Sequence, residues 1–463
     1  PEFLGNNENF LRINTFITAV LRGEGEKAVP KFLSSIEKIE DWSSIEGLCW
    51  IDQSDGIYHD NGIARVEDFA ALKYPETSLF FNWEKPFVQL ETSRGCFNTC
   101  AFCVSGGEKP VRFQSIGQVR ERLENICSNG IKDIRVLDRT FNYDTLRACE
   151  MLDIFREYKG RMRFHLEIHP ALISETLKEK LASMPEGLLH LEAGIQSLDS
   201  KVLAESGRRG SLESSLEGLE YLCSLDNLQT HADLIAGLPG YDLGMLRKDV
   251  AKLISMGVDE LQIESLKVLP GTQMRSSAPK TGLRFSPLPP YEVLQTPAMT
   301  PCDLIKAMQL SRMVDLYYNC PAWQKLTRRL AGNSERFITD FTDYLNSRMM
   351  PGSPVSIERR GVILYEYCRE HHPDMLTEVS IAWIEGGFSL KKEPAGKIGR
   401  LKHIGSIIGN SNIKILAEYG QAEPSHRYFL LDTGPRSYIF GFDSLEHQPF
   451  PVFKAEVKGI KDI

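Results

Sequence analysis

LETSRGCFNTCAFC, Leu90–Cys103, contains three cysteines in the spacing Cys-x3-Cys-x2-Cys: Cys96, Cys100 and Cys103. They come directly after an apolar segment that has the pattern of a strand. A structural zinc site normally closes with four protein ligands, and an iron–sulfur cube is usually held by four thiolates. Three thiolates leave one iron of a cube open to a reactant. The spacing therefore predicts a 4Fe–4S cluster with an open position.

The competing interpretation is a structural zinc site. The other cysteines closest in sequence are Cys49 and Cys127, and neither lies near the three. A distant histidine such as His59 or His165 would have to supply the fourth ligand. The protein would then be a zinc-stabilised binding module without enzymatic activity.

Composition limits the class of protein. The chain has 463 residues, of which 42% are hydrophobic and 25% charged, as in a globular protein of two or three domains. The net charge of −8 makes nucleic acid an unlikely partner. No apolar run approaches the ~20 residues of a membrane helix, and the start lacks a signal peptide. We therefore expect a cytoplasmic protein that does not enter a membrane.

Strand and helix patterns alternate from Pro86 to Ser265. Apolar strands that alternate with amphipathic helices predict a parallel sheet. Eight such units make a complete barrel, so six predict a partial (β/α)6 TIM-like barrel with its active site at the C-terminal strand ends. The six predicted strands lie in Phe87–Arg94, Asp133–Asp138, Arg163–Ile168, Gly187–Ser197, Gln229–Pro239 and Asp259–Leu269.

Different patterns stand on either side of this barrel. Residues 1–34 contain a strand, a glycine-rich turn and a helix, and residues 35–85 have the pattern of a linker with a few strands. The barrel occupies residues 86–288. Residues 289–463 are predicted to form a mainly helical C-terminal domain, with short antiparallel strands at RYFLLD, SYIFGFD and VFKAEV.

The cysteine spacing, with the aromatic Phe102 before the last cysteine, resembles the signature of radical S-adenosylmethionine (radical SAM) enzymes. The resemblance implies that Cys96, Cys100 and Cys103 bind a 4Fe–4S cluster whose open iron chelates S-adenosylmethionine. It also implies reductive cleavage of that cofactor to methionine and a 5′-deoxyadenosyl radical. The electron would come from a donor such as flavodoxin or ferredoxin.

The resemblance also implies cofactor-binding roles for residues at the predicted strand ends. Asp138 and Arg139 stand where the family contacts the amino end of S-adenosylmethionine, although the family's usual Gly-Gly-Glu is absent here. Glu167 would accept a ribose hydroxyl, and Gly237 would let the backbone approach adenine. Each could instead be an ordinary rim carboxylate or turn residue. The residues expected at the barrel mouth are Glu192, Gln196 and Ser197.

A second resemblance lies upstream, in Gly23, Glu24 and Gly25 with the glutamate that follows. This stretch is similar to the last strand and helix of the Rossmann-like domain in cobalamin-dependent radical SAM proteins. Residues 1–34 would then be the C-terminal remnant of that domain; the alternative is a plain turn. The usual Asp-x-His-x-x-Gly motif is absent, so we expect weak cobalamin binding by this chain alone.

The stretches DRTFN, EAGIQS, DLIAGLPG, LKVLPGTQM and PPYEVLQTP, in this order, resemble one branch of that group, whose members share a C-terminal domain of unassigned function. The implied reaction is cobalamin-dependent methyl transfer to an unactivated carbon of a small molecule or peptide. The alternatives are a radical rearrangement or cyclisation without methyl transfer, and methylthiotransfer to tRNA. The tRNA enzymes carry three further cluster cysteines upstream, whereas only Cys49 precedes Cys96. No residue is assigned a catalytic role beyond cofactor binding.

Overall fold

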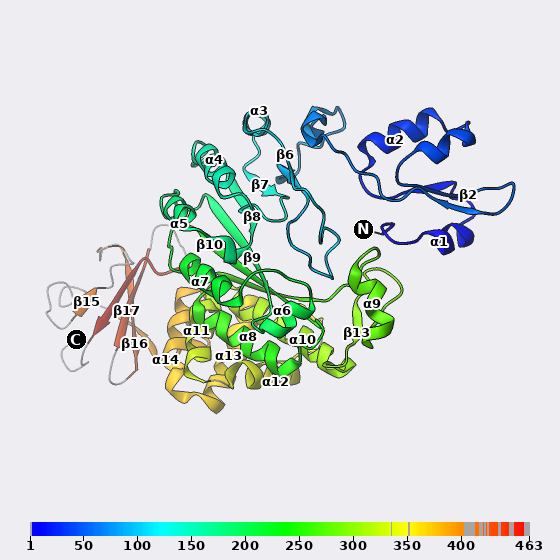
Figure 1. Ribbon diagram of the computed structural model, residues 1–463. Helices are drawn as coiled ribbons and strands as arrows, with labels where there is room; N and C mark the ends of the chain where they lie inside the picture. The colour runs from blue at the N-terminus through cyan, green and yellow to red at the C-terminus, as the bar shows by residue number, and fades with distance from the viewer. Residues whose placement is uncertain are drawn as a thin grey trace. The chain divides into compact units, whose positions relative to one another are not determined.

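The computed structural model describes residues 2–334, 336–350, 352–401, 413–415, 420, 423, 426–433, 437–443 and 449–457 (Figure 1). The chain divides into two compact units, Pro1–Asp249 with Met256–Met308, and Val250–Ser255 with Gln309–Ile463. Over the ranges just given, no helix has both the length and the apolar character that a membrane crossing requires.

A six-stranded parallel sheet lies at the centre of the first unit and confirms the predicted alternation (Figure 1). The strands follow one another in space in the order of the chain, so each crossover leads to the neighbouring strand. The first and last strands are not paired with each other, which makes the sheet a partial barrel. In order, the strands are β4 (Phe87–Leu90), β7 (Asp133–Val136), β8 (Arg163–Ile168), β9 (Leu189–Gln196), β10 (Gln229–Ala236) and β11 (Glu260–Ser265).

Side chains alternate between two environments along the central strands. Leu166, Leu191 and Leu234 are almost completely buried, whereas Glu167 and Glu192 are only half-buried. Alternate residues of a strand point to opposite faces of a sheet. The apolar face is therefore the one that the crossover helices cover, and the polar face lines the interior of the partial barrel.

Crossover helices begin where the sequence supplies capping residues. Ser115 forms a capping box with Gln118, and Asp144, Ser174 and Ser211 accept hydrogen bonds from the first turns of the next helices. These caps satisfy backbone N–H groups that have no partner within the helix. The helices are α3 (Ile116–Ser128), α4 (Thr145–Arg156), α5 (Glu175–Ala182), α6 (Ser200–Glu205), α7 (Leu212–Cys223) and α8 (Leu243–Met256).

The N-terminal segment folds together with residues that the sequence pattern assigned to a linker. Strand β1 (Ala19–Leu21) pairs antiparallel with β2 (Leu48–Ile51), which pairs with β3 (Tyr58–Asp60). Trp42 and Trp50 pack against α2 (Gly25–Ser34) in a small core. The predicted strand and helix of this segment are therefore present, and later residues complete their sheet. Helix α1 spans Glu8–Ile13, and three 3₁₀ turns span Ile39–Ser44, Phe69–Ala71 and Pro75–Thr77.

After the sixth strand come α9 (Gln273–Thr281) and the β12–β13 hairpin (Arg284–Phe285 and Val293–Gln295). The following chain is mainly helical, and the described part ends in an antiparallel sheet of order β14-β16-β17-β18-β15, in which β16, β17 and β18 are the three predicted strands. The helices are α10 (Pro301–Met313), a π-helical turn (Val314–Tyr318), α11 (Pro321–Asn333), α12 (Phe337–Arg348), α13 (Ile357–His371) and α14 (Leu376–Glu385). The strands are β14 (Ile398–Arg400), β15 (Ile413–Ile415), β16 (Arg427–Asp432), β17 (Ser437–Phe442) and β18 (Phe453–Val457).

Candidate functional site

The three cysteines lie in a compact loop beyond the C-terminal end of β4. A short β5–β6 pair (Ser93–Arg94 with Arg112–Phe113) closes the base of this loop. The Cys96 N–H donates to the Glu108 carbonyl at 3.0 Å, which holds the two sides of the loop together. Gly95 has φ +105°, and a Cβ there would lie 2.8 Å from the same carbonyl. Only glycine fits at this position, because the backbone is both left-handed and in close contact.

The thiols share one environment. Cys96 and Cys100 are buried, and Cys103 is half-buried. Burial raises the pKa of the Cys100 and Cys103 thiols, and the neighbouring thiols of the set raise both further. Arg208, 3.9 Å from the Cys100 sulfur, acts in the opposite direction and favours the thiolate. Three interacting thiols beside a cation form a ligand set for a soft metal centre.

The spacing of these thiols fits a cluster better than a single ion. Among the described residues, only His190, His231 and Glu260 bring three metal-ligand atoms all within 4.8 Å of one another. The three thiols are thus spread more widely than the ligands of one ion. A four-iron cube binds each cysteine through a different iron, so its thiolates stand further apart than those of one zinc ion. The loop therefore fits a 4Fe–4S cluster.

The histidines proposed as a fourth zinc ligand are engaged elsewhere. The His59 ring stacks on Trp50 in the N-terminal sheet, with ring centroids 4.6 Å apart. His165 Nε2 lies 2.6 Å from the Glu192 carboxylate on the barrel interior. Neither contact involves the cysteine loop, so the structure offers no support for zinc coordination by these histidines.

Asn98 is a residue of this loop that the sequence reasoning missed. Its side-chain oxygen accepts hydrogen bonds from the N–H groups of Thr99 and Arg209, at 2.9 and 2.8 Å. Its carbonyl accepts from the Gly107 N–H at 2.7 Å. Asn98 therefore joins both ends of the cysteine loop to the segment after α6. The only sign of Asn98 in the sequence is an asparagine two residues after a cysteine, and no simple motif includes it.

The residues predicted at the ends of β7 and β8 have different environments. The buried Asp138 carboxylate accepts from the N–H groups of Thr92 and Ser93, both at 2.8 Å, and from the Thr92 hydroxyl. It thus fixes the segment that leads into the cysteine loop. Arg139 is half-exposed and lies 3.7 Å from the Glu167 carboxylate. Burial raises the pKa of Glu167 to about 7, even though Arg139 acts to lower it.

The residues predicted at the barrel mouth are not all there. Glu192 lies on the interior face beside His165, and Gln196 has a left-handed φ of +72°. Such strain in a non-glycine residue is common at ligand sites. Ser197, in contrast, is completely buried, and its hydroxyl lies 3.4 Å from Asp249. Ser197 is therefore not exposed at the mouth, and its role in cofactor binding stays a prediction.

Packing within the chain requires glycine at position 237. Gly237 has φ +90°, and a Cβ there would lie 2.7 Å from Val293 and 3.3 Å from Leu304. A contact of the Gly237 backbone with adenine stays a prediction. Phe102 is half-buried within the cysteine loop, and its part in cofactor binding stays a prediction.

The Gly23–Gly25 stretch contacts the cysteine loop through Glu24. Glu24 forms ion pairs with Arg112 at 2.6 Å and Arg94 at 3.3 Å. Burial acts to raise the pKa of Glu24, but hydrogen bonds from Arg112 and Val66 outweigh it and hold the pKa below its usual value. Gly23 has φ +90°, and a Cβ there would lie 2.3 Å from the Ala64 carbonyl. The first glycine is therefore required by packing within this chain.

A cavity of about 290 Å³ lies where this stretch meets the cysteine loop. Residues of the N-terminal segment, of the cysteine loop and of the end of β7 line it together. Its lining includes Gly23, Glu24, Gly95, Ser105 and Arg139. The cavity shows that two motifs far apart in the sequence border one space.

Comparison with known families agrees with this geometry. Residues 90–253 match the radical SAM superfamily, and residues 280–381 match a family described as a protein of unknown function, DUF4080. The first match contains the three cysteines and most of the parallel sheet. Radical SAM enzymes use a 4Fe–4S cluster and S-adenosylmethionine, the cofactors that the cysteine loop predicts.

Curated relatives include methylthiotransferases and a methyltransferase. The chain is 26% identical over 207 residues to a tRNA-2-methylthio-N(6)-dimethylallyladenosine synthase of Herpetosiphon aurantiacus, covering 42% of this chain and 46% of the relative. It is 27% identical over 284 residues to an uncharacterized methyltransferase of Pyrococcus horikoshii, covering 56% and 57%. The chain thus spans about half the length of these relatives.

Solved structures share the fold at low identity. The cobalamin-dependent S-adenosylmethionine radical enzyme OxsB, with aqua-cobalamin bound, has a TM-score of 0.55 at 16% identity, covering 82% of this chain and 64% of OxsB. The radical S-adenosylmethionine methyltransferase TsrM from Kitasatospora setae, with cobalamin and a [4Fe-4S] cluster bound, has a TM-score of 0.50 at 18% identity, covering 64% and 62%. Together with the cysteine loop, the family matches identify residues 90–253 as a radical SAM domain, followed by a DUF4080 match at residues 280–381.

Proposed function

We propose that this chain takes part in cobalamin-dependent methyl transfer to an unactivated carbon of a small molecule or peptide. The observation that carries the proposal is the cavity bordered by Glu24 of the N-terminal segment and by Gly95 of the cysteine loop. A methyl donor and a radical source must reach the same substrate carbon. Glu24 belongs to the stretch that resembles the cobalamin-binding domain and Gly95 to the cysteine loop, so a cavity that both border supports a part for the two motifs in one reaction.

The chain's own residues position and protect the reactants. When bound, the cluster and S-adenosylmethionine would supply a 5′-deoxyadenosyl radical. Cys96, Cys100 and Cys103 would hold the cluster, and Asp138 would fix the segment that presents them. Arg139 and Glu167 lie at the strand ends, where they would bind the polar parts of S-adenosylmethionine.

Residues 1–34 do not by themselves form a crevice for cobalamin. A doubly wound domain binds its ligand outside the carboxyl ends of several parallel strands. Here β1 pairs antiparallel with β2, and the Ala64 backbone lies against Gly23. We therefore expect the N-terminal segment alone to bind cobalamin weakly.

Product analysis tests the proposal. Anaerobically reconstituted protein is incubated with a strong reductant and S-adenosylmethionine, with and without added cob(I)alamin. We expect 5′-deoxyadenosine in both samples, and S-adenosylhomocysteine only with cobalamin, because that product records transfer of the methyl group. Since this chain should bind cobalamin weakly, the cobalamin is added in excess. If S-adenosylhomocysteine does not form at any cobalamin concentration, this chain does not transfer the methyl group to cobalamin, and the proposal fails for it.

Methylthio transfer is a second candidate, because several curated relatives are methylthiotransferases. Cys49, the cysteine that precedes the cysteine loop in the sequence, gives no support for a second cluster. Cys49 is completely buried in β2 and packs with Leu11 and Val20. A second cluster would raise the iron content to about eight per chain, twice that of one cube. About four irons would favour the methyl transfer proposal over this candidate.

A further inference from the structure

We propose that His190, His231 and Glu260 form a binding site for a divalent zinc ion on the interior of the partial barrel. The three residues lie near the N-terminal ends of β9, β10 and β11. The cysteine loop follows the C-terminal end of β4, so the two sites occupy opposite ends of the parallel sheet. The proposed zinc site is independent of the cluster and of the proposed methyl transfer.

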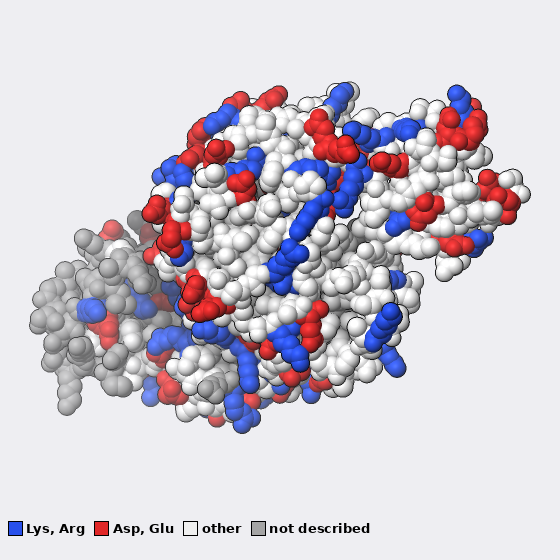
Figure 2. Space-filling model, in the orientation of Figure 1, with Lys and Arg blue, Asp and Glu red and all other residues white. Residues whose placement is uncertain are grey.

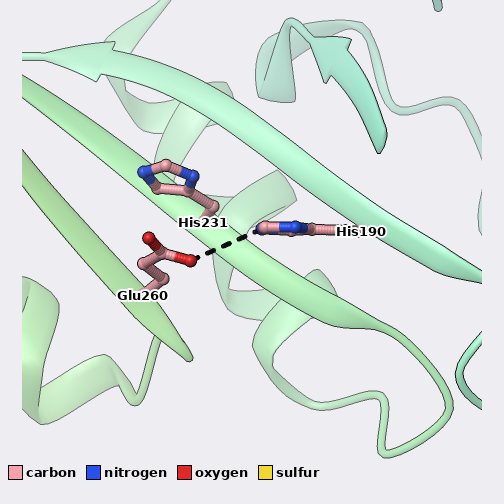
Figure 3. A group of neighbouring side chains, drawn as sticks. All are labelled: His190, His231 and Glu260. Atoms are coloured by element: carbon pink, nitrogen blue, oxygen red, sulfur yellow. Dashed lines mark ion pairs between the residues drawn. The ribbon is translucent and has the colours of Figure 1, made fainter. Parts of the chain in front are cut away.

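Strand register brings the three side chains together. His231 is directly opposite Glu260 in the β10–β11 pair, and His190 is opposite Gln229 at the start of β10. All three residues belong to the polar face of the sheet. Figure 3 shows the side chains converging from three neighbouring strands. Their ligand atoms all lie within 4.8 Å of one another.

The histidines have buried nitrogen atoms without hydrogen-bond partners. The His231 residue is only 5% exposed, and its Nδ1 has no partner among the described residues. Its Nε2 lies 3.1 Å from an Asp233 oxygen. His190 Nε2 is also buried without a hydrogen bond, and the Glu260 carboxylate is 3.9 Å away. Unsatisfied buried polar atoms are rare in native proteins, and a bound ion would satisfy these.

Three histidine rings are packed side by side here. The centroids of His190 and His231 are 5.6 Å apart, and those of His165 and His190 are 4.4 Å apart. Protonation of all three would place like charges in contact, which is unfavourable. Zinc binds the neutral imidazole, so an ion would stabilise this arrangement without such repulsion. The Glu192 carboxylate, 2.6 Å from His165, would keep that third ring oriented.

The types of ligand and the distances between them favour zinc over magnesium and calcium. Two imidazoles and one carboxylate are a known zinc set, whereas magnesium and calcium prefer oxygen ligands. Ligands of a tetrahedral zinc ion stand about 3.3 Å apart, so a small rotation of the Glu260 side chain closes the site. Glu260 has this freedom because its side chain is 40% exposed. A cavity of about 680 Å³, lined by these three residues with Arg135, Arg163 and Glu192, gives an ion access and room for a bound water.

Metal analysis of the full chain tests the site. Protein reconstituted with iron, sulfide and zinc is dialysed against a weak chelator, and both metals are measured. We expect about one zinc per chain beside the cluster iron. The same zinc content is expected in the Cys96→Ala/Cys100→Ala/Cys103→Ala variant, which cannot hold the ion at the cysteine loop. Cobalt(II) in place of zinc should give the visible absorption of a four-coordinate nitrogen and oxygen site.

Single-ligand variants identify the residues. His231→Asn and His190→Asn should each weaken zinc binding by more than about 100-fold. Loss of a residue that only hydrogen-bonds to a metal ligand already lowers metal affinity by about 10–100-fold, and these variants remove a ligand itself. Glu260→Gln, at a partly exposed strand end, is the variant least expected to disturb folding. The matched control is His371→Asn on the exposed end of α13. Zinc binding that is unchanged in all three ligand variants, or no zinc retained by the wild type, would overturn the proposal.

Discussion

At the residue scale, Glu167 gives a prediction about pH. Burial raises the pKa of its carboxyl to about 7, with Arg139 opposing and Glu192 adding to the effect. If the charged form accepts a ribose hydroxyl, the affinity for S-adenosylmethionine rises as the pH increases through about 7. Glu167→Gln should remove this pH dependence, and Glu167→Ala should weaken binding at pH 8 by roughly 1–3 kcal/mol. Equilibrium binding at pH 6 and pH 8 measures both effects, and equal pH dependence in wild type and Glu167→Gln would rule out the role.

Asp138 gives a second prediction at this scale. Its carboxylate satisfies two buried N–H groups and one hydroxyl in the segment before the cysteine loop. Asp138→Ala would leave them unpaired, at roughly 1–3 kcal/mol for each donor. We expect lower stability in urea unfolding together with reduced iron retention. Asp138→Asn keeps one acceptor oxygen and should lose less, and an alanine variant as stable as wild type would show that the contacts are not important.

Individual roles could be predicted from the sequence only where the chemistry is local. Cys96, Cys100 and Cys103 lie in one short loop, so their spacing in the sequence is enough to predict that the three thiols come together. Gly23 and Gly237 were assigned to cofactor contacts, but Ala64 and Val293 occupy the space beside them. These neighbours come from distant parts of the chain. No local pattern indicates that they fill that space.

At the element scale, a buried ion pair connects the segment before the barrel to its first helix. Arg122 of α3 and Glu76 of the Pro75–Thr77 turn are both almost completely buried and lie 2.6 Å apart. Removal of one partner leaves a buried charge without compensation, at about 3–5 kcal/mol. Arg122→Met should therefore be strongly destabilised in chemical denaturation. The double variant with Glu76→Gln should recover much of the loss, and a double variant less stable than Arg122→Met alone would contradict this explanation.

The elements of the barrel were predictable because their patterns are regular. Buried apolar residues at every second position mark β8 and β9, and Ser115 with Gln118 marks the start of α3. The small N-terminal sheet was not predictable to the same extent. Strand β2 has four residues and β3 has three, and β1, which pairs with β2, is distant in sequence. Such short strands carry too few residues to establish a period.

At the scale of the whole molecule, the cysteine loop and the proposed zinc site lie at opposite ends of the parallel sheet and border separate cavities. Acidic and basic side chains are interspersed on the face shown in Figure 2, so that face has no broad basic surface of the kind that binds nucleic acid. The chemistry is instead concentrated at the cysteine loop and along the strand interiors. The sequence predicted the first of these through its motif. It did not predict the second, because His190, His231 and Glu260 come together only through strand register.

The central claim is that the loop formed by residues 95–107 holds one 4Fe–4S cluster through three cysteines. Iron and sulfide analysis of anaerobically reconstituted protein tests it most directly. We predict about four irons and four sulfides per chain in the wild type, the content of one cube, and almost none in the Cys96→Ala/Cys100→Ala/Cys103→Ala variant. Cys127→Ala, which removes a half-buried thiol of α3, is the matched control and should keep the full content. Full iron content in the triple variant would contradict the assignment.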